Sequence, residues 1–514
     1  MTSQTTSNQG KKNSGLTWWT WIMFIVIMFF GIVGRFYDLS DAPLDFHPTR
    51  QLRSMLIARG MYYRTLDDVS PEKQQIAINQ MNAEGQIEPP IMEQLTAWGY
   101  KLVGSDDLRV PRVISIFFWI LGGVGLFLLL KKMISEWQAA IVGLAYFMVL
   151  PYALYASRSF QPEPLLTASI IWAWWGMLKW SEKKNWQWTI ISGLLAGFAI
   201  FVKSPALFFI IPAWLGLILA EPGLVKALRT PKVWIIVLLT ILPYAIYHIY
   251  GMYIDGFLQA QMSLRFFPDL WKDPFHYLSW ERMIASTLGI EFFLAGLVGI
   301  VLIRQKQFRI MFLGVWLGYF LYGMAFSYHI VTHDYYQVPF VPAVAVGLAA
   351  LAGAIFNKIP GKKSLFYGTL TVVMVFWMAV NFWDARMTLK HARYQDEPKF
   401  WASLGEKLGD RSVVSLTEDY GTRLSYWGWK PTTNWMSMGD IIYRQLGGQE
   451  VDTRSLLLQA VEGKDLFLVT DFEELERQAD VEDWLNQNYA VLDQSDRYLV
   501  FDLNQPLQIQ DVNP

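Results

Sequence analysis

Residues 16–35 read LTWWTWIMFIVIMFFGIVGR, the first long apolar run of the chain. An α-helix rises 1.5 Å per residue, so about 20 apolar residues cross the hydrocarbon core of a bilayer. The run is too long for a removed signal peptide and lacks a convincing small-residue cleavage site. It therefore predicts a first membrane-spanning helix.

Further apolar runs along the chain are also long enough to cross a bilayer. They are residues 110–130, 137–155, 164–180, 186–202, 205–220, 233–250, 284–303, 310–327, 335–356 and 364–382. The composition agrees, because 53% of the residues are hydrophobic and only 17% are charged, with many Trp, Tyr and Phe for interfacial belts. We therefore expect a polytopic α-helical membrane protein with about 11 transmembrane helices.

Basic residues predict the orientation of these spans. If Lys11 and Lys12 are cytoplasmic, the inward connections carry clusters of Lys and Arg, whereas the short outward connections carry only Arg158 and Lys203. Cytoplasmic loops carry such an excess of Lys and Arg. An odd number of spans then places everything after Asn381 outside the cytoplasm.

The remaining composition excludes several classes of site. A net charge of −1 gives no indication of nucleic-acid binding. The chain has 0 cysteines, which excludes disulfides, thiolate chemistry and any zinc site built on Cys.

The pattern of spans and loops predicts three parts. Residues 1–15 form a cytoplasmic tail, and residues 16–384 form a transmembrane part with outward loops at 36–108 and 251–283. Within the first loop, two amphipathic helices are expected in the membrane interface, over residues 48–64 and 90–102. The second loop is rich in aromatic residues and prolines, so we expect it to pack on the membrane surface or over a cavity as a mobile lid.

Residues 385–514 differ sharply in character from the rest of the chain. Charged residues become frequent, and strand-sized apolar runs appear at 413–417, 465–470 and 498–502. Helical patterns lie between these runs. The alternation predicts a small extracytoplasmic α/β domain.

Asp45 is the first candidate for chemistry, because it lies in the first outward loop just before the predicted helix at 48–64. A carboxylate there can stay ionised and face a lipid headgroup. Asp also commonly caps a helix, so a capping or solvated aspartate is an equally good interpretation.

Three further charged side chains lie at the outer ends of predicted spans, where an unpaired charge is costly. Arg158 suits bidentate binding of a phosphate or carboxylate, although it could instead form a salt bridge with Glu163. Lys203 opposes the charge bias of the spans, so binding a phosphate is a physical use for its ammonium group. Snorkelling of Lys203 to the interface is the alternative.

The turn at 328–336 joins two spans and holds His329, His333, Asp334, Tyr335 and Tyr336. Hydrogen-bond donors of this kind are suited to bind a sugar or a pyrophosphate-like head group. The two histidines are four residues apart, so they could instead form a metal pair if the segment is helical. Elsewhere, Glu291 is the one carboxylate well inside a predicted span, and a hydrogen bond to a neighbouring helix explains it as well as a role in a site does.

Several motifs occur in a recognisable order. They are Glu88-Pro-Pro-Ile91, Arg109-Val-Pro-Arg-Val-Ile-Ser115, Arg158-Ser-Phe-Gln-Pro-Glu-Pro164, Phe201-Val-Lys-Ser-Pro205 and His333-Asp-Tyr-Tyr-Gln-Val-Pro-Phe-Val-Pro342. With these motifs the chain resembles, over nearly its whole length, the protein O-mannosyltransferase and lipid A aminoarabinose transferase superfamily. Those proteins are integral-membrane glycosyltransferases of the C-type fold, glycosyltransferase family 39 in the broad sense.

The resemblance implies transfer of one sugar from a polyprenyl-phosphate donor to a glycan, lipid or protein acceptor outside the cytoplasm. It implies an inverting displacement, with an acidic residue of the first loop as general base. It assigns this base to Asp45 and the binding of the donor phosphate to Arg158 and Lys203, with Arg50 beside them. The pocket lining would come from Glu163, His333, Tyr335 and Tyr336.

One departure from the family leaves the base open. Many relatives carry an Asp-Glu pair just before the loop helix, whereas this chain reads Pro48-Thr-Arg-Gln51. Asp45, Asp41 and Glu88 therefore all remain candidates, and Glu163 is a further carboxylate near the expected site. No cofactor is implied firmly, and a requirement for a divalent cation is left open.

Two other classes compete with a transferase. A transporter or flippase would be expected to show repeated halves and charged or broken helices near the midplane of the bilayer. A non-catalytic envelope scaffold would need only the C-terminal part and a membrane anchor. Neither class explains the charged residues gathered at the outer ends of the spans.

Overall fold

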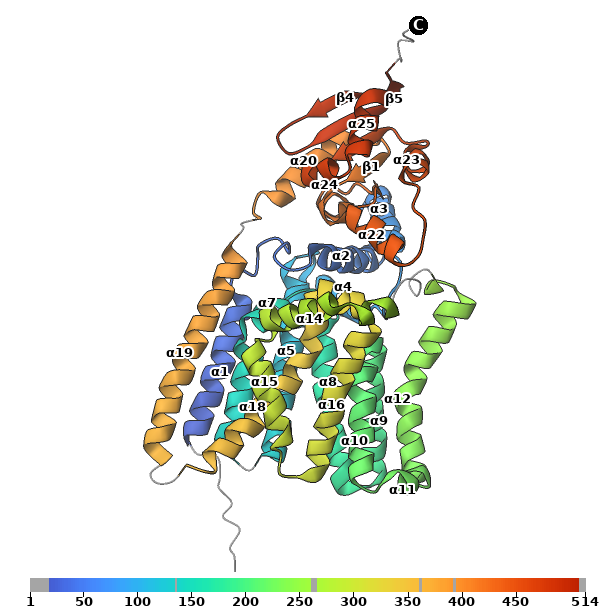
Figure 1. Cartoon of the computed structure of the whole chain (residues 1–514). Helices are drawn as coiled ribbons and strands as arrows, with labels where there is room; N and C mark the ends of the chain where they lie inside the picture. The colour runs from blue at the N-terminus through green and yellow to red at the C-terminus, as the bar shows by residue number, and fades with distance from the viewer. Residues whose placement is uncertain (1–17, 135, 260–265, 360–362, 392–393, 508–514) are drawn as a thin grey trace, which may run out of the picture.

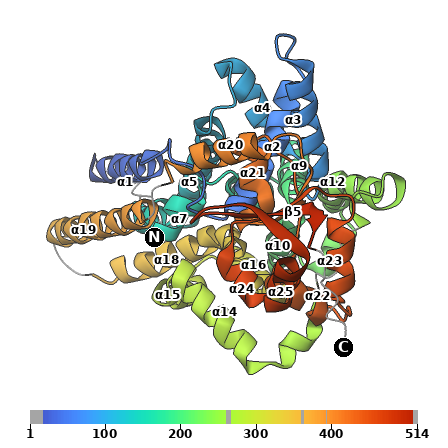
Figure 2. The same cartoon turned by 90° about the horizontal axis from the view of Figure 1, so that it is seen from above.

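The computed structural model describes residues 18–134, 136–259, 266–359, 363–391 and 394–507. The predicted cytoplasmic tail at 1–15, with Lys11 and Lys12, lies outside the described residues. Most of the helices before residue 391 run side by side in one bundle, and the C-terminal part lies beyond one end of that bundle (Figure 1). Seen along the bundle, α1 and α19 lie on one side and α12 on the opposite side (Figure 2).

Apolar helices of the bundle overlap with the predicted apolar runs. They are α1 (Trp18–Phe36), α5 (Arg109–Met133), α6 (Trp137–Val149), α8 (Glu163–Lys183), α9 (Trp186–Val202), α10 (Leu207–Ala220), α12 (Pro231–Ile249), α15 (Ile290–Val301), α16 (Lys306–Ala325), α18 (Val341–Phe356) and α19 (Lys363–Lys390). Within the described residues, 6 helices are long and apolar enough to span a membrane alone, or up to 7 if a bent pair counts as one span. A multi-pass membrane part is thus supported, but length and composition do not confirm a count of eleven.

The predicted span at 284–303 differs in the structure. Helix α14 (Pro274–Thr287) lies across the end of the bundle, and α15 leaves it at an angle of 93°. Gly289 lies between the two helices with a φ of 75°, a conformation that glycine adopts without the penalty a side chain would bring. The residues at 284–287 therefore belong to a helix at the bundle end rather than to a straight span.

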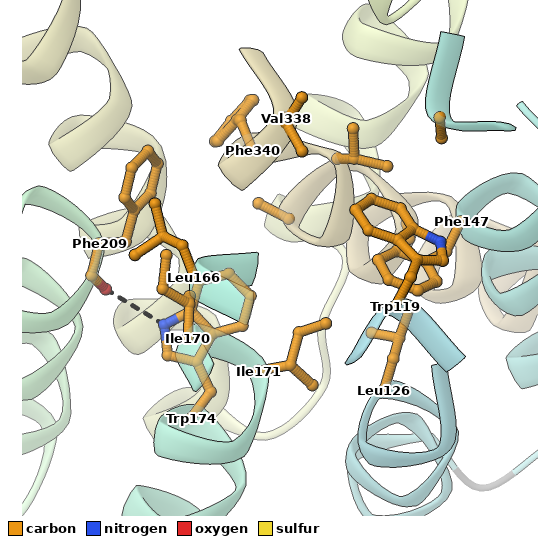
Figure 3. Close-up of a cluster of buried hydrophobic side chains, with 14 of the residues drawn as sticks. Trp119, Leu126, Phe147, Leu166, Ile170, Ile171, Trp174, Phe209, Val338 and Phe340 are labelled. Atoms are coloured by element: carbon orange, nitrogen blue, oxygen red, sulfur yellow. Dashed lines mark hydrogen bonds between the residues drawn. The ribbon is translucent and has the colours of Figure 1, made fainter. Parts of the chain in front are cut away.

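The interior of the bundle is held by close helix contacts and by aromatic rings. A Cβ added to Gly299 on α15 would lie 1.8 Å from the carbonyl oxygen of Gly347 on α18, so only glycine permits this approach. Figure 3 shows the buried cluster in which Trp119 stacks on Phe147, with ring centroids 4.3 Å apart. In the same view Trp174 donates a hydrogen bond to the carbonyl oxygen of Phe209 at 3.1 Å.

Helices α2 (Pro48–Tyr63), α3 (Pro71–Ala83) and α4 (Ile91–Val103) belong to the first loop and lie between the bundle and the C-terminal part (Figure 1). The pattern of residues 48–64 predicted an amphipathic helix in the membrane interface, with one face exposed to water. Instead, α2 is buried on most sides, because α3, α4 and, from the C-terminal part, α21 (Thr422–Trp427) pack against it. Arg59 of α2, for example, is buried and donates a hydrogen bond to the carbonyl oxygen of Tyr426 at 2.6 Å.

The C-terminal part contains a five-stranded sheet in the order β2-β1-β3-β5-β4. The strands are β1 (Val413–Leu416), β2 (Thr433–Asn434), β3 (Leu466–Val469), β4 (Tyr489–Gln494) and β5 (Leu499–Pro506). β1 pairs in parallel with β2 and β3, while β5 is antiparallel to β3 and β4. Helices α20 (Glu397–Leu408), α21 (Thr422–Trp427), α22 (Met438–Leu446), α23 (Thr453–Val461), α24 (Phe472–Arg477) and α25 (Ala479–Asn488) surround it. Alternate residues of β1 and β3 belong to two separate apolar cores, because side chains alternate between the faces of a strand.

Candidate functional site

A cavity of about 810 Å³ lies between the bundle end and the C-terminal part. Its lining on the bundle side includes several of the residues that the sequence singled out. These are Arg50, Glu88, Lys203, His333, Tyr335 and Tyr336. Side chains of the C-terminal part close the opposite wall, including Tyr420, Asp440, Tyr443 and Arg444. Residues from five distant segments of the chain therefore meet at one place.

Lys203 lies at the centre of the charged groups on the bundle side. It follows the end of α9 and precedes a short 3₁₀ turn, Ser204–Ala206, that contains Pro205. Proline disfavours helical geometry in the residue before it, which helps to end α9 here and places the cation at the helix end. The Lys203 Nζ lies 2.5 Å from Glu163 Oε1 and 3.3 Å from Glu88 Oε1.

Arg50 completes a cluster of two cations and two carboxylates, in which Lys203 and Glu163 are buried and Arg50 and Glu88 are partly buried. Its Nη2 lies 3.3 Å from the same Glu88 Oε1. The Tyr335 ring lies beneath both cations, with its centroid 5.4 Å from the Arg50 guanidinium carbon and 5.3 Å from Lys203 Nζ. Charges taken out of water are tolerated when they pair and are hydrogen-bonded, and this cluster is paired throughout.

The charges in this cluster stay ionised because of one another. Burial alone would raise the pKa of Glu88, but Arg50 and Lys203 outweigh it and hold the pKa at about 2. Burial would likewise lower the pKa of Lys203, whereas the carboxylates of Glu163 and Glu88 raise it above its usual value. For Arg50, burial is again opposed, chiefly by Glu88, and its pKa is raised. Glu88 is therefore a poor base for as long as both cations remain on it.

The turn at 328–336 contributes aromatic and polar side chains to the same cavity. Helix α17 (Ser327–Thr332) and a 3₁₀ segment, Asp334–Phe340, flank His333. Burial, and then the neighbouring His47, lower the pKa of His333 to about 4, so its imidazole is neutral at pH 7. Asp334 does not face an open site, since its Oδ1 lies 2.6 Å from His47 Nε2. It positions His47, whose ring contacts Tyr335 edge-on at a centroid distance of 4.8 Å.

Asp45 and Arg158 form a separate cluster outside the lining of this cavity. Arg158 Nη2 lies 3.8 Å from Asp45 Oδ2, and Arg112 Nη2 lies 3.6 Å from Asp45 Oδ1. Arg158 is buried and also donates hydrogen bonds to the carbonyl oxygens of Tyr37 and Asp38. The sequence allowed a pair between Arg158 and Glu163, but Glu163 instead pairs with Lys203.

Asp45 lines a different cavity, of about 420 Å³, whose other lining residues are Met387, Thr388, His391 and Tyr394. A third cavity, of about 400 Å³, adjoins the main one and shares with it Arg50 and residues 87–89. Glu88 therefore belongs to the wall between two cavities, whereas Asp45 is held by two buried guanidinium groups elsewhere. No pattern in the sequence indicated the adjoining cavity.

The C-terminal wall of the main cavity was also missed from the sequence. Tyr420, Asp440 and Arg444 belong to no motif, and their distance along the chain from residues 50–90 left nothing to connect them. Tertiary contacts supply the connection. Tyr443, for example, packs its ring against Phe267 and Tyr328, with centroid distances of 5.4 and 4.9 Å.

Comparisons with known proteins agree with this architecture. The family of dolichyl-phosphate-mannose-protein mannosyltransferases matches residues 87–250. The chain is similar to ArnT from Cupriavidus metallidurans, whose crystal structure was determined with bound undecaprenyl phosphate. The TM-score is 0.57 at 13% identity, and the match covers 95% of this chain and 98% of ArnT.

An oligosaccharyltransferase from Archaeoglobus fulgidus, solved in a complex with Zn and sulfate, has a TM-score of 0.50 at 10% identity. The match covers 87% of this chain and 68% of that protein. Curated proteins give no significant match to the sequence. The predicted resemblance to C-type integral-membrane glycosyltransferases is confirmed.

The Zn in that complex makes a metal site a relevant possibility for the described residues. Among them, no group of three or more His, Asp or Glu side chains is placed to hold a metal ion. His329 and His333 lie close, with ring centroids 5.4 Å apart, but without a third ligand. The described residues therefore form no metal centre.

Proposed function

We propose that this protein transfers a single sugar from a polyprenyl-phosphate donor to a glycan, lipid or protein acceptor on the extracytoplasmic face of a membrane. One observation carries the proposal. In a chain with the C-type fold, Arg50, Lys203 and Glu88 meet at one cavity where the helical bundle ends. A cavity that holds fixed cations beside a carboxylate at a membrane boundary suits a lipid-linked phosphate and an incoming hydroxyl.

In the proposed reaction, Arg50 and Lys203 bind the phosphate of the donor. A polyprenyl phosphate leaves readily only when its developing charge is neutralised, and preorganised cations supply that stabilisation where water is excluded. The similarity to ArnT, which was crystallised with undecaprenyl phosphate, supports a donor of this class. Tyr335 and Tyr336, whose rings lie near Lys203, would contact the sugar.

We assign the general base to Glu88 in preference to Asp45. Glu88 lies in the wall between two cavities, and a transferase needs its base where two substrates meet. A donor phosphate that binds Arg50 and Lys203 would neutralise the two cations that hold the pKa of Glu88 at about 2. Donor binding itself would therefore raise the pKa of Glu88 and make its carboxylate a better base. The acceptor hydroxyl then gives its proton to Glu88 as its oxygen bonds to the anomeric carbon, and the bond from that carbon to the phosphate oxygen breaks with inversion.

Glu163 remains paired with Lys203 in this scheme and keeps the ammonium group in place. Arg158 and Asp45 would hold the first loop against the bundle. We further propose the topology that the charge bias predicts, with about eleven crossings, the N-terminus in the cytoplasm and residues 385–514 outside as a separate α/β domain. The short helices α6, α9 and α10 would each cross once, as shorter apolar helices that are packed in the bundle.

The proposal is tested with purified protein in lipid nanodiscs. A panel of polyprenyl-phosphate sugars is incubated with an envelope fraction as the source of acceptor, and released polyprenyl phosphate is measured. We expect release with at least one donor from the wild-type protein and release slower by about 10² to 10⁴ from Glu88→Gln. Equal release from the wild-type protein and Glu88→Gln would remove Glu88 from catalysis, and failure to bind undecaprenyl phosphate would overturn the donor class.

A further inference from the structure

The wall of the main cavity that belongs to the C-terminal part has features of a binding surface in its own right. It presents Tyr420, Asp440 and Arg444 toward the cavity, opposite the cluster of Lys203 and Glu88. The cations on the bundle side already pair with carboxylates.

Tyr420 is held in this wall by an unusual backbone. Asp419 and Tyr420 both have a φ of 55°, a left-handed conformation that non-glycine residues seldom adopt. The surroundings enforce it, because Asp419 Oδ2 accepts a hydrogen bond from Arg423 at 2.6 Å and Asp419 Oδ1 accepts one from Thr49 at 3.2 Å. Strained backbone of this kind persists where the surrounding contacts fix it, and it is concentrated at functional sites.

The strained segment presents an aromatic face to the cavity. The Tyr420 side chain remains 45% exposed although it lines the cavity, so one part of the ring is available to a ligand. Its hydroxyl donates a hydrogen bond to Asp440 Oδ1 at 3.1 Å, which fixes the orientation of the ring. A fixed, half-exposed ring beside polar side chains is suited to stack against the apolar face of a sugar.

Arg444 is the second notable feature of this wall. Asp440 precedes it by four residues, the spacing of an ion pair on a helix. Asp440 is already engaged, because its Oδ2 accepts hydrogen bonds from the backbone nitrogen and the hydroxyl of Ser437, and its Oδ1 accepts one from Tyr420. Among the residues that the structure describes, Arg444 forms no ion pair. A guanidinium group that lines a cavity without a carboxylate partner is suited to bind an anion.

We propose that Tyr420 and Arg444 form the acceptor subsite, and that the acceptor is a saccharide carrying an acidic group, a carboxylate or a phosphate, that pairs with Arg444. The inference rests on the proposed function, since it assigns the second substrate of the same reaction. The sugar ring stacks on Tyr420, and its acidic group lies at Arg444. The reactive hydroxyl faces Glu88 across the cavity. Arg444 also lies in the last turn of α22, where a positive charge interacts favourably with the helix dipole. A purely structural role in stabilising α22 is therefore the competing explanation.

The test measures binding by saturation-transfer NMR titration on the full-length protein in nanodiscs. The probes are a disaccharide ending in glucuronate, the matched neutral disaccharide ending in glucose, glucose 6-phosphate, and undecaprenyl phosphate. The variants are Arg444→Gln, Tyr420→Leu and, as a matched control, Arg477→Gln, whose exposed guanidinium pairs with Glu474 outside the cavity. The two acidic sugars distinguish a carboxylate from a phosphate as the bound group.

We expect one acidic sugar to bind more tightly than the neutral one. Arg444→Gln should weaken its binding about tenfold, the equivalent of one charge-assisted hydrogen bond, and should leave undecaprenyl phosphate unaffected. Tyr420→Leu should weaken both disaccharides, and Arg477→Gln neither. The proposal is overturned if the neutral sugar binds equally well, if Arg444→Gln changes no saccharide affinity, or if it weakens undecaprenyl phosphate instead. Undecaprenyl phosphate binding without any saccharide binding would overturn the acceptor subsite alone, whereas the absence of both would overturn the proposed function.

Discussion

Replacing Lys203 by Met separates the two consequences of its positive charge, one for stability and one for donor binding. The Lys203 side chain is 10% exposed and pairs with Glu163, which is 3% exposed, and with Glu88. Met keeps the apolar stem but leaves two buried carboxylates with only Arg50. Removal of one partner from a buried ion pair destabilises a protein by about 3–5 kcal/mol, so Lys203→Met should lower the unfolding temperature clearly.

The double variant Lys203→Met with Glu163→Gln restores the balance of charge. It leaves Arg50 paired with Glu88 and no buried carboxylate without a cation, so we expect most of the lost stability to return. Affinity for undecaprenyl phosphate should not return, because the phosphate still lacks one charge-assisted hydrogen bond worth about 1.5–3 kcal/mol. This corresponds to a loss of roughly 10- to 150-fold in affinity.

Thermal unfolding followed by tryptophan fluorescence, and titration with undecaprenyl phosphate, measure the two effects separately. Lys184→Met is the control, because Lys184 pairs with Glu221 at 2.6 Å in an exposed position. An exposed pair contributes about 0–1 kcal/mol, so neither quantity should change much. If the double variant recovers both stability and donor affinity, Lys203 only neutralises Glu163, and its assignment to the donor phosphate is refuted.

Three further predictions follow from the same structure. Glu88→Gln should lower turnover by about 10² to 10⁴ while keeping donor affinity, and Asp45→Asn should turn over nearly normally; the opposite result returns the base to Asp45. A reporter that is active only in the cytoplasm should be silent when fused after residue 507, and a bright signal would mean an even number of spans. Because the folded protein holds the pKa of His333 at about 4, below the usual 6.5, the unfolded chain binds this proton first as the pH falls. Stability should therefore decline between pH 6.5 and 4, and His333→Phe should make that decline shallower in thermal unfolding measured across this range.

The hydrophobic pattern allowed part of the site to be predicted from the sequence. Lys203 and Glu163 could be recognised because each lies at the end of an apolar run, and the run fixes where along the membrane normal a side chain lies. The hydrophobic pattern does not determine the direction in which a side chain points. Arg158 and Glu163 are close in sequence, yet the turn between them sends Arg158 toward Tyr37 and Asp38 and leaves Glu163 with Lys203.

The C-terminal part shows the same limit. The apolar runs at 413–417, 465–470 and 498–502 coincide with β1, β3 and β5, whose central residues are buried. β2 was not predicted, because it consists of two exposed polar residues. β4 was also missed, although it begins with the apolar residues 489–492, of which Val491 and Leu492 are exposed. The residues that close the cavity lie between the strands, Tyr420 in a short 3₁₀ segment and Asp440, Tyr443 and Arg444 on α22, outside the apolar runs that predicted the strands. The docking of α21 on α2 and the packing of Tyr443 against Phe267 and Tyr328 bring them to the site.

The absence of the Asp-Glu pair of many relatives has a local explanation at Gln51. Its Nε2 donates hydrogen bonds to the carbonyl oxygens of Phe46 and Pro43, at 2.6 and 3.3 Å, while its Oε1 accepts one from the Phe160 backbone nitrogen at 3.0 Å. An amide can donate and accept at once, whereas a carboxylate here would face two carbonyl oxygens and have nothing to donate. The carbonyl oxygens around Gln51 therefore disfavour an acidic side chain at this position. The neighbouring Arg50 faces the cavity as a cation, so under the proposed function the carboxylate of the base comes from Glu88, which lies on the same side of the cavity 3.3 Å from Arg50.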